Sequence, residues 1–257
     1  MYDPASPLLR VGDNFGNPPG PEAKARFAED RLLDAVIWCE IMPGDTVTEA
    51  DVMERFGLTR AAARAGLMRL GYDSWASPLA RQGWQILPIS GALIGQVLEA
   101  RRFAEPSLAS ARLSAEARKE LSDIGVIVAT LSQRREESAL MSFRHYVDRV
   151  DSLLLCAINP LTARHLRKLW HHSARITRFL EDEQGGQALH RDDIAELIEA
   201  VLAEDGDAIT SLRLSLIEAQ EKLFMRQLLK SEAPLSHRSG SIVSHRPTDA
   251  ANHRRDL

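Results

Sequence analysis

The sequence predicts a mostly α-helical protein in which a small N-terminal unit of three helices and a hairpin precedes an antiparallel bundle of helices. Aromatic residues make up only 5% of the 257 residues, whereas Ala, Leu, Arg and Glu, which favour helices, are abundant. Apolar residues recur at steps of three and four from about residue 24 to residue 230. Strand-like alternation replaces this period only over residues 74–88. An all-β fold is therefore not expected.

Length, charge and cysteine content narrow the class of protein. A chain of 257 residues predicts two compact units. The formal charge of −4 gives no overall excess of positive charge, so any basic surface for nucleic acid must be local. Cys39 and Cys156 lie far apart in apolar helical runs, which fits buried free thiols better than a disulfide or a metal site. No apolar run approaches the roughly 18 residues of a membrane span, and we expect a cytoplasmic protein.

The first two helices are delimited by residues that favour helix ends. A helix is predicted over residues 24–41, where Pro43 and Gly44 stop it. Thr48 begins the next helix, with Asp51 three residues on as an approximate capping box. Gly57 is placed to end this second helix.

A third helix and a hairpin complete the N-terminal unit. Thr59 can cap a helix over residues 60–70, whose core side is Ala63, Leu67 and Leu70. Residues 74–88 alternate as in strands, with Pro78 and Gly83 as turn residues, which predicts a two-stranded hairpin. This order of elements is typical of a winged helix-turn-helix domain, and such domains usually bind DNA.

The rest of the chain is predicted to be helical to about residue 230. Residues that helices tolerate poorly, such as Asn159-Pro160, Gly185-Gly186 and Gly206, separate six helices. The predicted ranges are 92–111, 114–132, 136–158, 161–182, 191–204 and 207–230. Helices of this length joined by short turns form an antiparallel bundle that can enclose a pocket.

These patterns divide the chain into four parts. We expect a flexible tail over residues 1–22, a winged helix-turn-helix DNA-binding domain over 23–90, an all-helical domain over 91–233, and a second flexible tail over 234–257. The tails contain too few large apolar residues to offset the entropy lost on ordering.

Positive charge is concentrated on the predicted DNA-binding elements. From residue 55 to residue 88 there are five arginines and one acidic residue, Asp73. Arginine can form paired hydrogen bonds with guanine or bind a phosphate. The predicted DNA contacts are Arg55, Thr59, Arg60, Arg64, Arg69, Arg81, Gln82 and Gly83. Gly83 is expected at the hairpin tip, where it would let the backbone approach the sugar-phosphate surface. The alternative is a solvated arginine face on an Ala-rich helix.

Four stretches form an ordered set along the chain: PGDTVTEADVMERFGLTRAAARAGLMRL, RQGWQILPIS, LIGQVLEARRFAEPSLAS and CAINP. They resemble the GntR family of bacterial transcription regulators, in its FadR-type branch with a C-terminal FCD ligand-binding domain, which implies that residues 91–233 are an effector-binding and dimerisation domain. The resemblance implies a homodimer, most often a repressor, in which Arg60 and Arg64 contact a palindromic operator while Thr59 and Gly83 lie near phosphates. Ala61-Ala62 and Ala65-Gly66 depart from the usual family residues. Gly66 is expected to weaken its helix by about 1 kcal/mol relative to alanine.

The same resemblance bears on the pocket of the bundle. Many FCD domains hold a divalent ion with one Asp and three His, but the matching positions here are Tyr146, Val150, Ile194 and Leu216. These side chains cannot replace carboxylate and imidazole ligands, so we expect a metal-free pocket without a cofactor. The predicted effector-binding residues are Arg101, Tyr146, Arg149, Val150, Ile194 and Leu216. Arg101 is expected to meet a carboxylate of the effector, with an internal ion pair to Glu105 as the alternative.

Other polar residues support weaker hypotheses. His145 and Asp148 are three residues apart and could form a shifted metal site, and His190 is a further polar residue near the pocket. His165, His171 and His172 are expected on the surface. A competing function is an all-α enzyme or small-molecule-binding protein whose winged unit contacts other proteins. We expect no enzyme, because no nucleophile with a base, phosphate loop or metal spacing stands out.

Overall fold

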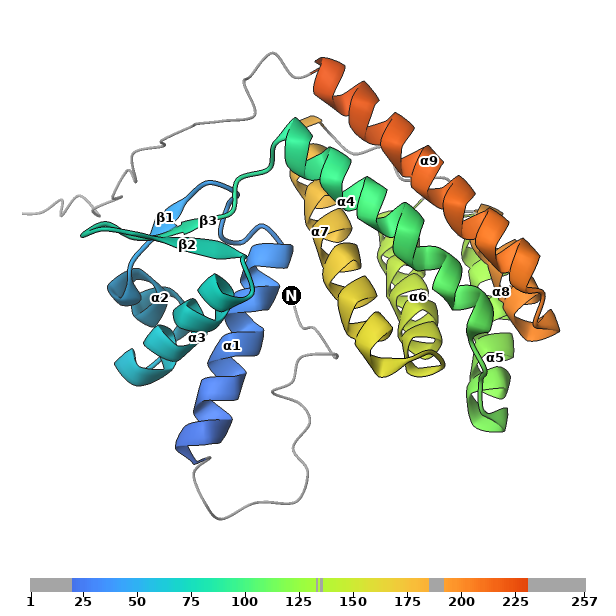
Figure 1. Cartoon of the computed structure of the whole chain (residues 1–257), viewed down its shortest axis with the longest axis horizontal. Coiled ribbons are helices and arrows are strands. Elements are labelled where there is room, and N and C mark those ends of the chain that lie inside the picture. Colours follow the sequence, from blue (N-terminus) through green and yellow to red (C-terminus); the bar gives the residue numbers. More distant parts are fainter. Residues whose placement is uncertain (1–19, 133, 135, 185–191, 231–257) are drawn as a thin grey trace, which may run out of the picture.

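The computed structural model describes residues 20–132, 134, 136–184 and 192–230, and it confirms a mostly α fold with an N-terminal winged helix-turn-helix followed by an antiparallel helical bundle (Figure 1). The predicted tails, apart from residues 20–22, and the Gly185-Gly186 break and His190 lie outside the described residues. The winged unit consists of α1 (Pro21–Ile37), β1 (Thr46–Val47), α2 (Glu49–Phe56), α3 (Arg60–Tyr72), β2 (Ala76–Leu79) and β3 (Gly83–Ile86). The bundle consists of α4 (Gly91–Ala104), the 3₁₀ helix η2 (Glu105–Ser110), α5 (Ala115–Ser132), α6 (Glu137–Cys156), α7 (Pro160–Gln184), α8 (Asp192–Ala203) and α9 (Gly206–Lys230).

The predicted caps of α2 and α3 form, whereas α1 ends at Ile37 and not at residue 41, because Cys39 turns the chain with a φ of 54°. The backbone N–H of Thr48 donates to Asp51 Oδ2 at 2.8 Å, and the N–H of Asp51 donates to Thr48 Oγ1 at 3.2 Å, which closes a capping box. Gly57 ends α2 in the left-handed conformation, with φ 64°. The hydroxyl of Thr59 accepts from the N–H of Ala62 at the start of α3.

The sheet has three strands instead of the predicted two. β3 lies in the centre, antiparallel to β2 on one side and to β1 on the other, with Val47 opposite Trp84. The prediction missed β1 because its two residues lie between the Pro43-Gly44 turn and the cap of α2. So short a strand has no readable alternation of its own, and it forms only by pairing with residues almost forty positions later.

Close packing of α1 against α3 depends on Gly66. A Cβ atom at this position would lie 2.7 Å from Leu32 Cδ1 and 3.2 Å from the carbonyl oxygen of Ala28. Leu32 is fully buried, so its side chain has little room to move away. From the sequence alone, Gly66 is expected only to lower the stability of its helix. The structure adds a reason for glycine here, because a side chain would push α1 and α3 apart.

The bundle helices begin and end within a few residues of their predicted bounds, with one difference. The predicted helix over residues 92–111 ends at Ala104 and continues as η2, in which Pro106 occupies the first turn. The main core lies among α5, α6, α7 and α8 and contains Leu121, Leu154, Leu166 and Leu197. A smaller core between α4, α7 and α9 contains Ile94, Ile176 and Phe224. No described helix is long and apolar enough to cross a membrane.

Aromatic contacts join the winged unit to α7. The ring of Trp75 stacks on the ring of His172 with their centroids 3.9 Å apart. The guanidinium carbon of Arg178 lies 3.0 Å from the centroid of the Trp38 ring. His172 is only 7% exposed, so the prediction that it lies on the surface is wrong. The prediction failed because the face of α7 that carries His172 is covered by a unit distant in the chain.

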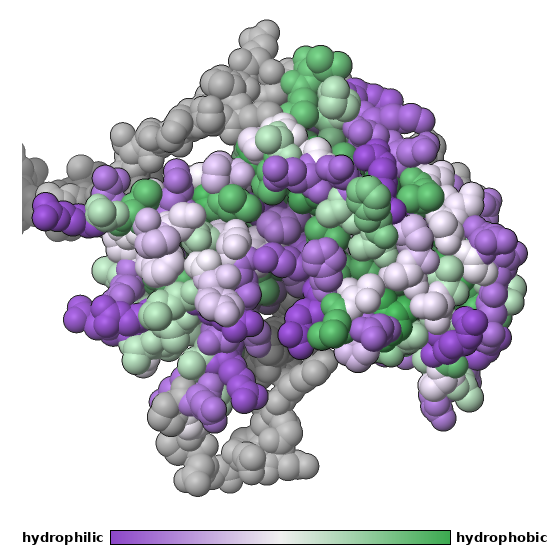
Figure 2. Space-filling view, viewed as in Figure 1, coloured by the Kyte–Doolittle hydropathy of each residue, from purple (hydrophilic) through white to green (hydrophobic). Residues whose placement is uncertain are grey.

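Hydrogen bonds at the same junction involve Arg175, which is fully buried. Its guanidinium donates to the carbonyl oxygen of Leu87, and its own carbonyl accepts from the thiol of Cys39. Figure 2 shows hydrophilic residues gathered where the winged unit meets the bundle. Both cysteines are free thiols, but Cys156 is exposed, so the expectation of two buried thiols is confirmed only for Cys39.

Candidate nucleic-acid interface

One face of α3 is anchored in the core, and the opposite face is exposed. Ala63, Leu67 and Leu70 are buried. Arg60 and Arg64 lie one turn apart on the exposed face, which agrees with the orientation expected from the helical period. In Figure 1, α1 lies between α3 and the bundle, so the exposed face of α3 is turned away from the bundle.

The exposed face of α3 continues beyond the two arginines as a stripe with a step of four residues. Met68 is 58% exposed and Tyr72 is 85% exposed, and they follow Arg60 and Arg64 along the helix. We call Arg60, Arg64, Met68 and Tyr72 the α3 stripe. Two guanidinium groups in the first half of this stripe, next to the capped N-terminus of the helix, can approach a DNA major groove together.

Arg64 is held by a carboxylate on the neighbouring helix. Its Nε donates to Glu49 Oε1 at 2.8 Å, and its side chain remains 67% exposed. This contact uses one of the five N–H groups of the guanidinium. Within the described residues the two terminal nitrogens of Arg64 make no hydrogen bond, so they stay available for paired bonds to a base or phosphate. Arg60 forms no ion pair within the same part of the chain. Glu49 could not be predicted from the sequence as a partner of Arg64, because the contact joins residues 15 positions apart.

The remaining predicted DNA contacts differ in their surroundings. Arg55 is exposed, but its guanidinium donates to the carbonyl oxygen of Glu40 and lies 5.4 Å from the ring of Phe56. Arg69 forms an ion pair with Asp73 at 2.8 Å at the far end of α3.

The wing tip presents Arg81 and Gln82, which are both exposed. Arg81 has a φ of 64°, and the N–H of Gln82 donates to the carbonyl oxygen of Leu79, which closes the turn between β2 and β3. Arg81 therefore has the freedom to contact a nucleic-acid backbone, whereas the side chains of Arg55 and Arg69 are engaged in local contacts.

Gly83 lies at a different place in the hairpin from the one predicted. It does not form the tip of the turn but is the first residue of β3, with a φ of 107°. A Cβ atom here would collide with the carbonyl oxygen of Val47 and lie 3.3 Å from the Cα of Thr48. The side of Gly83 on which a side chain would lie is thus filled by Val47 and Thr48, and contact of the Gly83 backbone with DNA stays a prediction. Glycine is needed for the packing of the wing on β1.

The predicted effector residue Arg101 lies in a buried ionic network at the centre of the bundle. Its Nε donates to Glu105 Oε1 at 2.5 Å. Its Nη1 donates to Ser173 Oγ at 3.0 Å and also to Gln220 Oε1. The structure therefore contains the internal ion pair that was the alternative for Arg101.

Arg213 completes this network from α9. It donates to Glu105 Oε2 at 2.7 Å and to Asp151 Oδ1 at 2.9 Å, while Trp170 Nε1 donates to Glu105 Oε1 at 2.9 Å. We call Arg101, Glu105, Asp151, Trp170, Ser173, Arg213 and Gln220 the bundle network. It contains two cationic and two anionic side chains, so its charges balance.

The electrostatics of the bundle network favour the charged forms of Glu105 and Arg213 despite their burial. Burial alone would raise the pKa of Glu105, but the charges of Arg213 and Arg101 together with hydrogen bonds hold it below its ordinary value. Burial opposes the charge of Arg213, yet Glu105 and Asp151 raise its pKa. For Asp151 burial prevails, and its pKa is raised.

The sequence contains a pattern from which part of this network could have been predicted. Arg213 and Gln220 lie on the same face of α9 as the buried Ile209, Ile217 and Phe224.

The other five predicted effector residues lie in the core or on the surface of the bundle. Val150 and Ile194 are buried in the main core, and Tyr146 and Leu216 pack against it. Arg149 is exposed on α6, where its Nε and Nη2 donate to the Glu120 carboxylate at 2.5 and 2.7 Å. Arg149 thus lies on the surface and the other four residues lie in or against the core, and their contact with an effector stays a prediction.

No group of three or more His, Cys, Asp or Glu side chains that could hold a metal ion occurs among the described residues. His145 and Asp148, the alternative metal site, are both exposed. The ring of His145 packs edge-on against Tyr146 with centroids 5.7 Å apart.

Comparison with known proteins gives a likeness of fold. No family model and no curated protein match the sequence. Among solved structures, E. coli McbR/YncC has a TM-score of 0.66 at 15% identity, with 80% of this chain and 98% of that chain covered. A GntR transcriptional regulator from Rhodococcus sp. RHA1 has a TM-score of 0.61 at 15% identity, with the same coverage of both chains. The likeness spans nearly the whole of each of these proteins, so it covers the winged unit and the bundle together.

Proposed function

We propose that this protein is a DNA-binding transcription regulator of the GntR type, with a FadR-type arrangement in which an FCD-like bundle follows the winged unit. The observation that carries the proposal is the α3 stripe, where Arg60 and Arg64 are exposed on a capped helix whose other face is anchored in the core. The shared fold with a solved transcriptional regulator supports it, and no enzyme is implied.

The proposal includes a homodimer that binds a palindromic operator and represses transcription. Two copies related by a two-fold axis would present two α3 stripes to successive turns of the major groove. The spacing of the stripes would then set the spacing of the half-sites. Native mass spectrometry of the purified chain would measure the mass of the assembly and of any ligand that it retains. A reporter gene behind the bound sequence would distinguish repression from activation.

The first experiment measures DNA binding by the full chain and by the separate variants Arg60→Ala and Arg64→Ala. The probes are a duplex from upstream of the protein's own gene and a random duplex of equal length. Each substitution is expected to weaken specific binding by about 1–3 kcal/mol, which is about 5- to 150-fold. Arg118→Ala is the control, because Arg118 lies on α5 in a surface ion pair with Glu204.

A salt series separates specific contacts from general attraction to phosphate. The slope of the logarithm of the binding constant against the logarithm of salt concentration should fall by about one for each lost phosphate contact. If both variants bind the upstream duplex as tightly as the parent across the series, the α3 stripe does not contact DNA and the proposal is refuted.

A second prediction concerns Glu49, which holds Arg64. Glu49→Gln removes a negative charge near the DNA and loosens the Nε contact, so binding to the random duplex should strengthen while the preference for the upstream duplex falls. The expected loss of preference is up to about fivefold, since exposed ion pairs contribute at most about 1 kcal/mol. Competition binding with both duplexes measures the ratio. Glu54→Gln is the matched control on α2, because Glu54 is exposed and forms no ion pair in the described chain. An equal loss of preference in both variants would mean that Glu49 acts only through its charge.

A further inference from the structure

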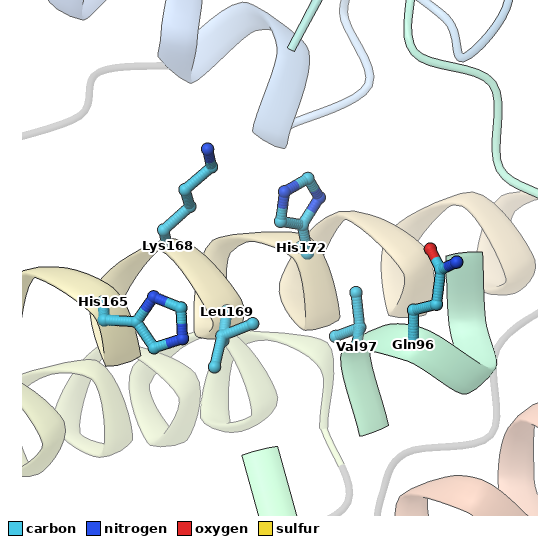
Figure 3. A pocket seen from close by; sticks show the side chains of 6 residues that line it. All are labelled: Gln96, Val97, His165, Lys168, Leu169 and His172. Carbon is cyan, nitrogen blue, oxygen red and sulfur yellow. The ribbon is translucent and has the colours of Figure 1, made fainter. Parts of the chain in front are cut away.

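A pocket lies on α7 beside α4, below the point where α7 meets the winged unit (Figure 3). Its volume is about 240 Å³. It is lined by Gln96, Val97, His165, Lys168, Leu169 and His172. None of the residues predicted to bind an effector is among them. Figure 3 shows the basic side chains on α7 and Gln96 and Val97 on α4.

The basic residues of the pocket continue along one face of α7. His165, Lys168, His172 and Arg175 follow one another at steps of three and four residues. The lining contains no acidic side chain. In the described part of the chain, none of these four residues forms an ion pair. Lys168 and Arg175 therefore carry positive charge here without a carboxylate among the lining residues to balance it, in contrast to the bundle network.

Two buried side chains on this face of α7 have nitrogen atoms without a hydrogen-bond partner. The Nδ1 atom of His172 is buried and unbonded, and so are Nε and Nη1 of Arg175. Buried polar atoms are nearly always hydrogen-bonded, and leaving one unsatisfied costs about 1–3 kcal/mol. Burial, followed by the charges of Arg175, Lys168 and His171, lowers the pKa of His172 to about 3. The ring is thus neutral at pH 7, and one of its nitrogens carries a proton that it can donate.

The pocket also has an apolar part. Val97 and Leu169 are buried lining residues; in Figure 3 Leu169 lies beside His165 and Lys168 on α7, and Val97 lies next to Gln96 on α4. A ligand with a short apolar body and one negatively charged group would satisfy both parts of the lining. A fully hydrated inorganic ion would leave the apolar part without a contact.

We propose that this pocket binds a small organic carboxylate, with its charged group held by Lys168, His165 and His172 and its apolar body against Val97 and Leu169. The site lies outside the bundle network. A carboxylate is a hydrogen-bond acceptor only, so it complements a lining that contains a lysine and two imidazole rings but no acidic side chain.

The location gives the ligand a direct connection to the winged unit. His172 lines the pocket and also stacks on Trp75, which lies between α3 and β2. A ligand that moves the His172 ring must therefore change this contact. If the protein binds DNA as proposed, the carboxylate shifts the position of the α3 stripe and so changes DNA affinity, and this part of the inference rests on the proposed function.

Isothermal titration calorimetry of the full chain tests the site with three probes: sodium benzoate, sodium acetate and inorganic phosphate, each against a matched sodium chloride titration. Benzoate is expected to bind one molecule per chain, and about tenfold or more tighter than acetate or phosphate because it alone fills the apolar part. Lys168→Ala and His165→Ala should each weaken benzoate binding by about tenfold. Both residues are at least partly exposed, so the variants are expected to fold. Lys119→Ala, at an exposed lysine on α5, should bind benzoate like the parent.

The possible results distinguish carboxylate binding in the pocket from its effect on DNA affinity. Absence of benzoate binding, equal binding of all three probes, or binding that survives both α7 substitutions would overturn the site. If benzoate binds as expected but leaves the affinity for DNA unchanged, the connection through Trp75 is wrong and the site stands. If the chain binds no DNA at all, the proposed function fails, while the calorimetric result still decides the pocket.

Discussion

Glu105→Gln is expected to lower the free energy of unfolding by about 3–5 kcal/mol, the usual cost of removing one partner from a buried group of charges. Glu105 is fully buried and accepts from Arg101, Arg213 and Trp170. With glutamine in its place, two buried arginines would share a single carboxylate, Asp151. The amide would also present an N–H group toward donors, which adds an unsatisfied contact.

Urea denaturation at pH 7, followed by circular dichroism, measures this loss. Glu204→Gln is the matched control, because Glu204 pairs with Arg118 at 2.9 Å on the surface, where the two side chains are 48% and 37% exposed. This control should lose less than about 1 kcal/mol. Similar losses in the two variants would show that the bundle network contributes no more to stability than a surface pair.

The pH dependence of stability offers a second measurement on the same variant. The pKa of Glu105 is lowered in the folded protein from an ordinary value of 4.5, so the folded state binds a proton less readily than the unfolded state. The stabilisation from this group is complete above about pH 4.5 and is lost as the pH falls through the folded pKa. The difference in stability between the parent and Glu105→Gln should therefore shrink below pH 4.5. A constant difference would mean that Glu105 is not ionised in the folded protein.

The bundle network fills the centre of the bundle with paired charged side chains, at a place where a ligand pocket was predicted around Arg101. Its members come from α4, η2, α6, α7 and α9, so a single cluster joins elements up to 119 residues apart. Because every charge has an opposite charge in contact, the cluster can remain in the core without solvent. A pocket at this place would have to break several of these contacts. This is the physical reason to look for a ligand on the outer face of α7 instead.

Local signals in the sequence were sufficient to predict where the helices lie. The Thr48–Asp51 capping box, the left-handed Gly57 and the cap at Thr59 all depend on residues within four positions of one another. The exposure of Arg60 and Arg64 follows in the same way from the helical period. Features that depend on distant residues were not predictable: β1 needs β3, Arg64 needs Glu49, and His172 is buried by Trp75.

Gly83 was misassigned for the same reason. From the sequence, a glycine between Gln82 and Trp84 in a predicted hairpin indicates a turn, and a turn in a winged unit suggests contact with DNA. The strand that excludes a side chain at Gly83 is β1, which the sequence pattern does not reveal. The glycine thus indicated a special backbone position in the hairpin, whereas its contact with β1 could be found only from the structure.

Gly83→Ala is expected to destabilise the protein by about 2–4 kcal/mol, since a φ of 107° strains any other residue and the new methyl group would collide with the Val47 carbonyl oxygen. Two further glycines separate these causes. Gly57→Ala has the φ strain but open space around it, and should lose about 1 kcal/mol, whereas Gly95→Ala lies exposed in α4 with open space and should gain up to about 1 kcal/mol. Thermal unfolding of the three variants gives the order. If Gly83→Ala loses no more than Gly57→Ala, the wing can move away from β1, and the close contact with Val47 is not what requires glycine.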